Sequence, residues 1–296
     1  MDRATEVEPN PAKSPQSQPA PPPIAAHATM RVGSDLPFFA GMIILGGFYV
    51  VMIVAMLLAD LRYANAPAIL NALNSPEIRY SIKLSLISCS LTALLSLWVA
   101  VPLGYLMSRY RFPGRTLIDA IIDIPIVLPP LVVGLSLLIL FQTRVGKRFE
   151  DTFGPVTFAV PSVILAQFMV ACAFAVRTMR TTFDQISPRQ EQVALTLGCS
   201  KSQAFFFVVL PQARRGIITA ATLAWARALG EFGPILLFSG ATRGRTEVLS
   251  TSVYLEFSIG NLEAAVALSL LMIVISIAVL VALRYFGLER MWKTAG

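Results

Sequence analysis

Six long apolar segments constrain this chain more than any other feature of its sequence. They lie near residues 37–59, 80–107, 118–141, 156–178, 215–239 and 262–286. Each has the roughly 20 residues that an α-helix needs to cross about 30 Å of hydrocarbon. Helices are the expected form, because an open strand would leave backbone groups without hydrogen bonds in lipid. The segments therefore predict an all-α integral membrane protein with six transmembrane helices.

Composition supports lipid as the main surrounding of this chain. Only 14% of its 296 residues are charged and 55% are hydrophobic, whereas a soluble domain carries about 25% charged residues. The net charge of +7 comes from Lys and Arg that lie mostly between the apolar segments, where they suit lipid headgroups better than nucleic acid. We therefore expect membrane lipid, and no nucleic acid, as a partner.

The chain offers no set of residues for catalysis or metal binding. Its single histidine, His27, lies near the N-terminus, and Cys89, Cys172 and Cys199 have neither CxxC nor metal-ligand spacing. Reduced structural thiols are the default for such cysteines. We accordingly predict no catalytic residue and no metal site in this chain.

The ends of the chain differ from its apolar body. Residues 1–36 are polar and rich in proline, which favours an extended or disordered tail; a Pro-rich recognition segment is the alternative. Residues 37–286 form the predicted membrane domain, and residues 287–296 form a short polar end.

The distribution of Lys and Arg predicts the orientation. With both termini in the cytoplasm, 15 of these residues lie in inner segments and eight in outer loops, and Arg227 lies inside a span. The excess on the inner side agrees with the positive-inside rule. We thus expect cytoplasmic N- and C-termini, although Lys147 and Arg148 lie on the unfavoured side.

A polar loop at 187–211 joins the fourth and fifth segments and has the pattern of two short helices. Residues 187–190 read as an N-cap followed by proline at the first helical position, and Gly198 is a suitable C-terminal stop. Residues 200–203 form a second capping box, and Pro211 is expected to break the second helix before the next span. This pattern predicts an amphipathic turn that inserts into a groove of a partner; the alternative is an ordinary loop lying on the headgroups.

Charged residues within the fifth segment are candidates for function. Arg227 and Glu231 are four residues apart and share one helical face. Charges at this depth cost about 2.5–3.5 kcal/mol each on insertion scales, so they face protein or water. They either form a structural ion pair or line a gate. Gly230, Gly233 and Pro234 weaken the helix just beyond them.

The third segment is interrupted by prolines at 125, 129 and 130. Such breaks persist in membranes where neighbouring protein or a cavity provides hydrogen-bond partners for the freed carbonyl groups. Asp119 and Asp123 lie near the inner end of this segment, as a proton or ion site or as inter-helix hydrogen-bond and salt-bridge acceptors near Arg109–Arg115. The gate candidates are Arg227, Glu231, Gly233, Pro129 and Pro130.

The loop resembles the EAA loop of ABC importer permeases, roughly E-A-A-x3-G-x9-I-x-L-P, which docks a separate ATPase. Gln192 occupies the position where that family most often has Glu, and Glu191 lies one residue earlier, so this chain carries the negative charge one position before the usual one. This chain contains no phosphate loop, since Gly146-Lys147 lacks the required neighbours. ATP and Mg²⁺ would thus be bound by a partner. The residues assigned to ATPase coupling are Glu191, Gln192, Ala194, Leu197, Gly198, Leu210 and Pro211.

Two membrane blocks narrow this resemblance. Residues 123–134 resemble the D-x-P-x-V-L-P-P-x-V-x-G segment of molybdate-type permeases, and residues 226–233 resemble their A-R-A-L-G-E-F-G segment. Residues 244–249 and Tyr254 resemble the outer stretch that follows. The resemblance covers about residues 38–286 and implies a type I ABC importer permease of the molybdate, tungstate and sulfate group.

This family implies a homodimer in the inner membrane, two ATPase copies and an external substrate-binding protein. Its members work by alternating access and deliver a tetrahedral oxyanion, and they are not themselves enzymes. Two alternatives stay open: an importer for another anion or small solute, and a membrane-embedded enzyme or sensor. Co-purification of a stoichiometric ATPase subunit would distinguish a transporter from an enzyme.

Overall fold

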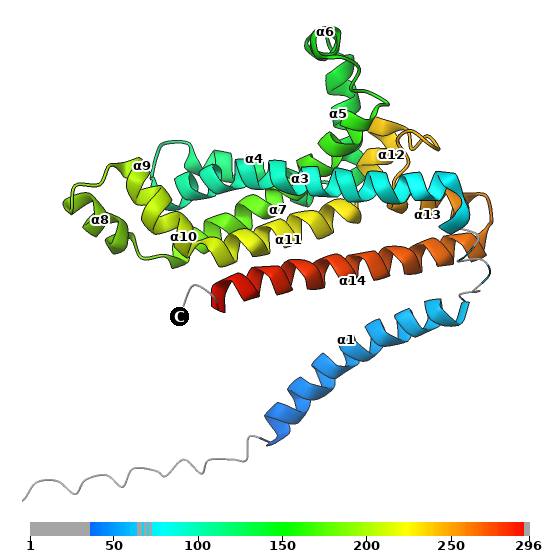
Figure 1. Ribbon diagram of the computed structural model, residues 1–296, viewed down its shortest axis with the longest axis horizontal. Helices are drawn as coiled ribbons and strands as arrows, with labels where there is room; N and C mark the ends of the chain where they lie inside the picture. Colours follow the sequence, from blue (N-terminus) through cyan, green and yellow to red (C-terminus); the bar gives the residue numbers. More distant parts are fainter. Residues whose placement is uncertain (1–35, 64–66, 68–69, 71–72, 293–296) are drawn as a thin grey trace, which may run out of the picture. The chain divides into compact units, whose positions relative to one another are not determined.

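The computed structural model describes residues 36–63, 67, 70 and 73–292, and every regular element in this part of the chain is helical. The chain separates into two units, residues 1–53 and 54–296. The helices are α1 (Leu36–Tyr63), α3 (Pro76–Arg109), α4 (Arg115–Val127), α5 (Pro130–Gln142), α6 (Arg144–Phe153), α7 (Val160–Gln185), α8 (Pro188–Thr196), α9 (Lys201–Ala204), the π-helical turn η1 (Phe205–Val209), α10 (Leu210–Gln212), α11 (Arg214–Leu229), α12 (Gly233–Ser239), α13 (Leu249–Ser258) and α14 (Leu262–Trp292) (Figure 1).

The predicted all-α membrane fold is confirmed. Four of the described helices are long and apolar enough to cross a membrane, and two bent pairs raise the number to six if each pair forms one span. Helix α1 is 28 residues long, and its large apolar side chains are exposed, as suits a helix whose solvent is lipid.

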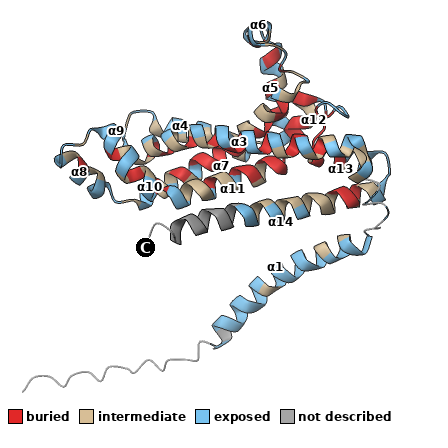
Figure 2. Ribbon diagram, in the orientation of Figure 1, coloured by how far each residue is buried: buried red, intermediate tan, exposed pale blue. Residues whose placement is uncertain are grey.

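The core of the second unit lies where α3, α7 and α11 pack together, and buried residues concentrate there in Figure 2. Small residues let the backbones approach closely: a Cβ added at Gly104 of α3 would lie 2.9 Å from the Cβ of Met179 on α7. One turn after another, α3 buries Ser81, Ser85, Ser88, Thr92 and Ser96. Its Thr92 hydroxyl donates to Gln167 of α7 (3.3 Å), whose amide donates to the carbonyl of Ala228 on α11 (3.2 Å). Polar contacts therefore tie the three helices inside the apolar bundle.

The third predicted span is not one straight helix. Helices α4 and α5 meet at 111°, and the residues between them, Leu128 and Pro129, have extended backbone. A residue before proline avoids the helical region, and both Leu128 and Pro129 precede a proline. Pro130 then occupies the start of α5, where a missing N–H does no harm.

The fifth apolar segment, 215–239, is not one continuous helix, and its interruption lies where Gly230, Gly233 and Pro234 were expected to weaken it. Helix α11 ends at Leu229, and α12 starts anew at Gly233. At 1.5 Å per residue the 16 residues of α11 cover about 24 Å, less than the hydrocarbon thickness. Gly230 and the Gly233-Pro234 pair interrupt the helix within the apolar stretch.

The two ends of the bundle carry different features. Helices α8 and α9 lie at one end, and α13 lies at the other (Figure 1). We call the first the coupling end, after the 187–211 loop, and the second the far end.

Candidate functional site

The first helix of the loop has the predicted boundaries. The Ser187 hydroxyl accepts a hydrogen bond from the Arg189 amide (3.4 Å) at the start of α8. At its end Gly198 has φ +93°. The Gly198 amide donates to Leu195 (3.0 Å) and the Cys199 amide to Ala194 (3.1 Å). These bonds form a Schellman cap, which requires a left-handed residue that glycine supplies without strain.

The second helix starts as predicted and ends differently. Ser200 and Gln203 form the reciprocal capping box, at 2.8 and 3.3 Å. The helix then continues past Pro211 to Gln212, so the prediction that Pro211 ends it is wrong. The π-helical turn η1 lies just before the proline, and the 70° bend into α11 comes after Gln212. A π turn shifts the hydrogen-bond register locally, which accommodates the missing proline N–H within the helix.

Glu191 turns toward its own subunit. Its carboxylate accepts a 2.5 Å hydrogen bond from the Tyr105 hydroxyl of α3 and lies 3.4 Å from Arg109 Nε. Its side chain is 13% exposed. Arg109 also donates to the carbonyl of Ile186, just before the loop (2.8 Å), and the Tyr105 ring packs 4.6 Å from that of Phe205. The loop is thus anchored to α3.

Tyr105 and Arg109 were missed in the sequence analysis, because more than 80 residues separate them from Glu191 and no local pattern links them.

The exposed part of the loop lies on its other side. Gln192 and Pro211 are exposed, Leu197 is 81% exposed beside the Gly198 turn, and Ala194 is buried. The loop therefore exposes an apolar side chain, Leu197, at its tip.

The predicted gate residues lie together. A cavity of about 190 Å³ is lined by Pro129, Pro130 and Gly233 together with Arg227 and Glu231. The break between α4 and α5 thus lies beside the break between α11 and α12. Sequence positions a hundred residues apart meet at one interrupted site inside the membrane domain.

Arg227 and Glu231 form an ion pair with 2.6 Å between Nη1 and Oε1. Glu231 is 1% exposed, whereas Arg227 is 29% exposed and reaches the ring of Phe174 on α7, with its guanidinium carbon 5.7 Å from the ring centre. The buried carboxylate holds the arginine, and the arginine faces the cavity. The structural and the gating interpretations of this pair therefore both fit the observed geometry.

Helices α5 and α12 touch through their backbones. A Cβ added at Gly134 would lie 2.6 Å from Pro234 Cα, and one at Gly233 would lie 3.2 Å from the Leu131 amide nitrogen. Contacts this close leave no room for independent sliding. The two segments beyond the breaks are thus positioned to move together.

Asp119 and Asp123 accept inter-helix ion pairs, one of the two roles expected for them, although their partners lie outside the expected region. Asp123 accepts a bidentate pair of hydrogen bonds from Arg177 (2.8 and 2.6 Å), and Asp119 pairs with Arg180. Both arginines are on α7 rather than in the Arg109–Arg115 region. The α4 carboxylates therefore join α4 to α7, and the ion-pair interpretation fits better than a proton or ion site.

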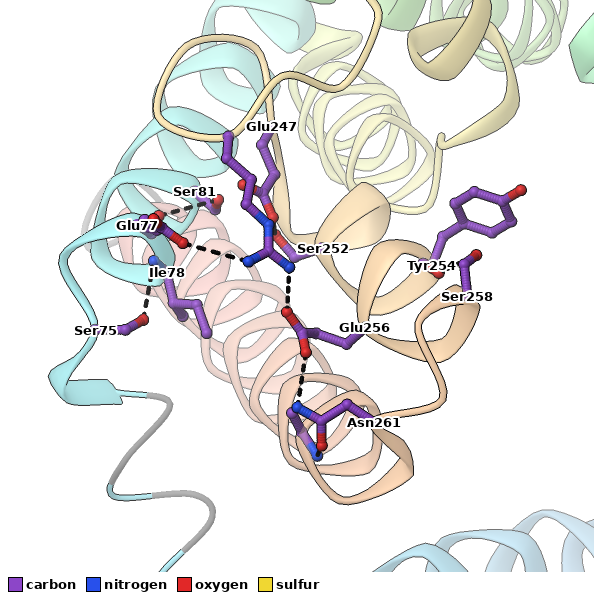
Figure 3. A network of polar contacts seen from close by, with 12 residues as sticks. Ser75, Glu77, Ile78, Ser81, Glu247, Ser252, Tyr254, Glu256, Ser258 and Asn261 are labelled. Atoms are coloured by element: carbon purple, nitrogen blue, oxygen red, sulfur yellow. Dashed lines mark hydrogen bonds and ion pairs between the residues drawn. The ribbon is translucent and has the colours of Figure 1, made fainter.

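At the far end, Arg243 pairs with Glu77 of α3 and Glu256 of α13, the two carboxylates labelled in Figure 3. It lies 3.6 Å from Glu77 of α3 and 2.5 Å from Glu256 of α13, and Glu256 accepts from Asn261 before α14 (2.9 Å). Nearby Glu247 is buried and accepts from the Ser252 hydroxyl (2.7 Å). Burial raises the pKa of Glu247 above its usual value. These contacts join α3, α13 and the residue before α14 at the far end.

Within the described residues, no group of three or more His, Cys, Asp or Glu could hold a metal ion.

Comparisons of the sequence identify relatives. A family model described as "Binding-protein-dependent transport system inner membrane component" matches residues 100–289. The molybdenum transport system permease protein ModB of Escherichia coli (strain K12) is 37% identical over 186 residues, covering 62% of this chain and 80% of ModB. The molybdate/tungstate permease WtpB of Pyrococcus abyssi is 33% identical over 217 residues, covering 73% and 82%. The sulfate permease CysT of E. coli (strain K12) is 28% identical over 254 residues, covering 85% and 89%.

The fold also matches a solved structure. A crystal structure of a bacterial alginate ABC transporter, in complex with its pentasaccharide-bound periplasmic protein, contains a chain with TM-score 0.71 and 15% identity. The match covers 86% of this chain and 95% of that one, and supports the fold alone. Together with the family match over more than half of the sequence, these findings show that the chain belongs to the inner membrane components of binding-protein-dependent transport systems.

Proposed function

We propose that this chain is the permease subunit of an ATP-driven importer for a tetrahedral oxyanion, with molybdate first and tungstate or sulfate next. The observation that carries the proposal is the two-helix loop, which is anchored to α3 and presents Leu197 at its tip. Relatives named for molybdate, tungstate and sulfate transport support the cargo. An importer for another anion or small solute would keep the same loop.

Docking of a separate ATPase is the role we assign to the loop. Leu197 would insert into a groove of that partner, since an exposed apolar side chain at a helix end is a suitable anchor. ATP and Mg²⁺ would act in the partner alone. Closure of the ATPase pair would push α8, and the Glu191–Tyr105 contact would transmit the movement to α3.

The assembly that we propose is a homodimer of this chain with two ATPase copies and an external binding protein. The coupling end faces the cytoplasm together with both termini, which agrees with the excess of Lys and Arg on that side. Residues 1–36 would form a cytoplasmic tail, 37–286 the permease domain and 287–296 a cytoplasmic end; 1–35 and 293–296 lie outside the described residues.

At the gate, Arg227 would give the passing anion one positively charged contact. The Glu231 carboxylate orients it and partly offsets its charge, which keeps binding weak enough for release. The breaks around the cavity would supply the hinge, because helix interruptions absorb backbone changes.

Elemental uptake tests the proposal. Cells with and without this chain, starved of the three anions, receive molybdate, tungstate or sulfate at low concentration, and Mo, W and S are measured after washing. We expect the deletion to abolish uptake of one element. Unchanged uptake of all three, in cells with no second importer, would refute the oxyanion assignment and leave the family assignment intact.

A further inference from the structure

Helix α13 contacts the interruption between α11 and α12 at two points. The hydroxyl of Ser250 donates to the backbone carbonyl of Glu231 (2.7 Å). One turn later on α13, the ring of Tyr254 packs against the ring of Phe232, with 5.4 Å between the ring centres. Glu231 and Phe232 are the last two residues before α12 starts at Gly233. One face of α13 therefore holds the segment that joins the two helices.

The Ser250 hydroxyl bonds a carbonyl that lies between the two helices. Helix α11 ends at Leu229, and the backbone hydrogen bonds of α12 begin with the Leu236 amide, which donates to the carbonyl of Phe232 (2.8 Å). The Glu231 carbonyl lies one residue before that bond, in a residue that is 1% exposed. A buried carbonyl without a hydrogen bond is costly. Ser250 therefore supplies a donor at the point where the helix is interrupted.

The other side of the interruption is held by the bundle core. The Gln167 amide of α7 donates to the carbonyl of Ala228, near the end of α11 (3.2 Å). Gln167 is buried and accepts from Thr92 of α3. The end of α11 is thus fixed to α7 and α3, whereas the segment after it is held by α13.

The opposite face of α13 belongs to the far end. At about 3.6 residues per turn, residues four apart share a helix face and residues two apart lie on nearly opposite faces. Glu256 pairs with Arg243 (2.5 Å), and Figure 3 shows Tyr254 directed away from Glu256. A displacement of α13 at the far end would therefore move both contacts with the interruption.

Glu231 joins these contacts to the proposed gate. Its carboxylate holds Arg227 (2.6 Å), while its backbone carbonyl accepts from Ser250. Among the described residues, the lining of the gate cavity includes Glu231 and Phe232 but neither Ser250 nor Tyr254. We propose that Ser250 and Tyr254 are positioning residues of the gate, through which α13 sets the geometry of the Arg227–Glu231 pair and links it to the far end. This inference rests on the proposed function.

Hydrogen exchange over residues 230–236, in the full-length chain in lipid nanodiscs, tests the positioning role. Ser250→Ala should speed this exchange about two- to tenfold, since one neutral hydrogen bond changes a local equilibrium by that factor. Ser258→Ala is the matched control, because Ser258 is exposed on the same helix and its hydroxyl donates to the carbonyl of Tyr254 (2.7 Å). Ser250→Thr keeps the hydroxyl and should restore the wild-type exchange.

The Tyr254 contact is tested by a second pair of variants. Tyr254→Leu removes the ring and should speed exchange over residues 230–236, whereas Tyr254→Phe keeps the ring and should match the wild type. Exchange in Ser250→Ala and Tyr254→Leu equal to that in Ser258→Ala would overturn the positioning role.

The link to the far end has its own test. Arg243→Met removes the pairs with Glu77 of α3 and Glu256 of α13, so it should also speed exchange over residues 230–236. Arg245→Met, at an exposed position of the same loop, is the matched control. Equal exchange in these two variants would overturn the link between the far end and the gate.

ATP hydrolysis by the complete transporter in liposomes distinguishes positioning from a merely structural role. A less favoured resting gate should raise hydrolysis without the binding protein about two- to tenfold in Ser250→Ala and lower the anion imported per ATP, whereas a structural loss would lower hydrolysis as well. Faster exchange with unchanged hydrolysis and import would overturn the role at the gate. The expected changes in exchange and hydrolysis, without import of molybdate, tungstate or sulfate by the wild type, would support this inference and refute the oxyanion assignment.

Discussion

The Glu191 anchor gives the sharpest prediction. In an importer with this loop, a carboxylate near position 191 could either bind the ATPase or hold the loop to its own subunit. The structure has Glu191 bonded to Tyr105 and Arg109 of α3. We predict that Tyr105→Phe loosens α8 without removing the ATPase from the complex.

The magnitude follows from the contacts. A hydrogen bond to a charged group contributes about 1.5–3 kcal/mol, and the 2.5 Å contact is shielded because Glu191 is only 13% exposed. Arg109 still holds the carboxylate after the substitution, so we take a loss of about 1–2 kcal/mol. Since about 1.4 kcal/mol is tenfold in an equilibrium, local opening of α8 should rise about 5–30-fold.

Hydrogen exchange in the purified transporter measures this opening over residues 188–197. The ratio of anion imported to ATP hydrolysed should fall in parallel, because a loose loop transmits less movement. Gln192→Glu is the matched control: its side chain is exposed, so exchange should stay unchanged. If Glu191→Gln instead dissociates the ATPase while exchange over 188–197 does not change, the anchor interpretation is refuted.

Three further predictions concern the gate and the far end. Arg227→Gln should lower import by at least about tenfold, while the ATPase still co-purifies. Import at the wild-type rate by this variant would show that Arg227 does not contact the anion. Glu231→Gln should lower import less, because the arginine remains. Gly134→Ala should lower the thermal midpoint by forcing a Cβ against Pro234, at about 1–3 kcal/mol, and an unchanged midpoint would contradict the tight contact. Burial raises the pKa of Glu247 in the folded protein, so its ionisation opposes folding, and the free energy of unfolding should fall as pH rises through that raised pKa. Glu247→Gln should flatten this part of the stability–pH profile. A stability–pH profile identical to that of the wild type would contradict the raised pKa.

The sequence predicted the helices and the loop well where the determinants are local. The two caps of the loop depend on residues three to five apart, namely the Gly198 turn and the Ser200–Gln203 box. Apolar length likewise identified α3, α7 and α14 as spans. Local rules were insufficient at Pro211, because the preceding π turn absorbs a proline that would otherwise end a helix.

Contacts between distant residues could not be read from the sequence. Asp119 and Asp123 were expected near Arg109–Arg115, which is close in sequence, but α7 supplies Arg180 and Arg177 from more than 50 residues away. Charge pattern predicts that a carboxylate in a membrane needs a partner, while the choice of partner depends on which helix packs beside it.

The predicted gate residues show how a weak sequence signal becomes specific in three dimensions. Prolines at 129 and 130 predict a break in one helix, and Gly230 with Gly233-Pro234 predicts another, but each break alone is compatible with a simple kink. The fold brings both to one cavity, where Arg227 is exposed and Glu231 is buried. An interrupted helix in lipid needs partners for its freed backbone groups, and here two interruptions lie side by side, bound by the Gly134–Pro234 contact. For the proposed gate, this arrangement would let both segments turn together.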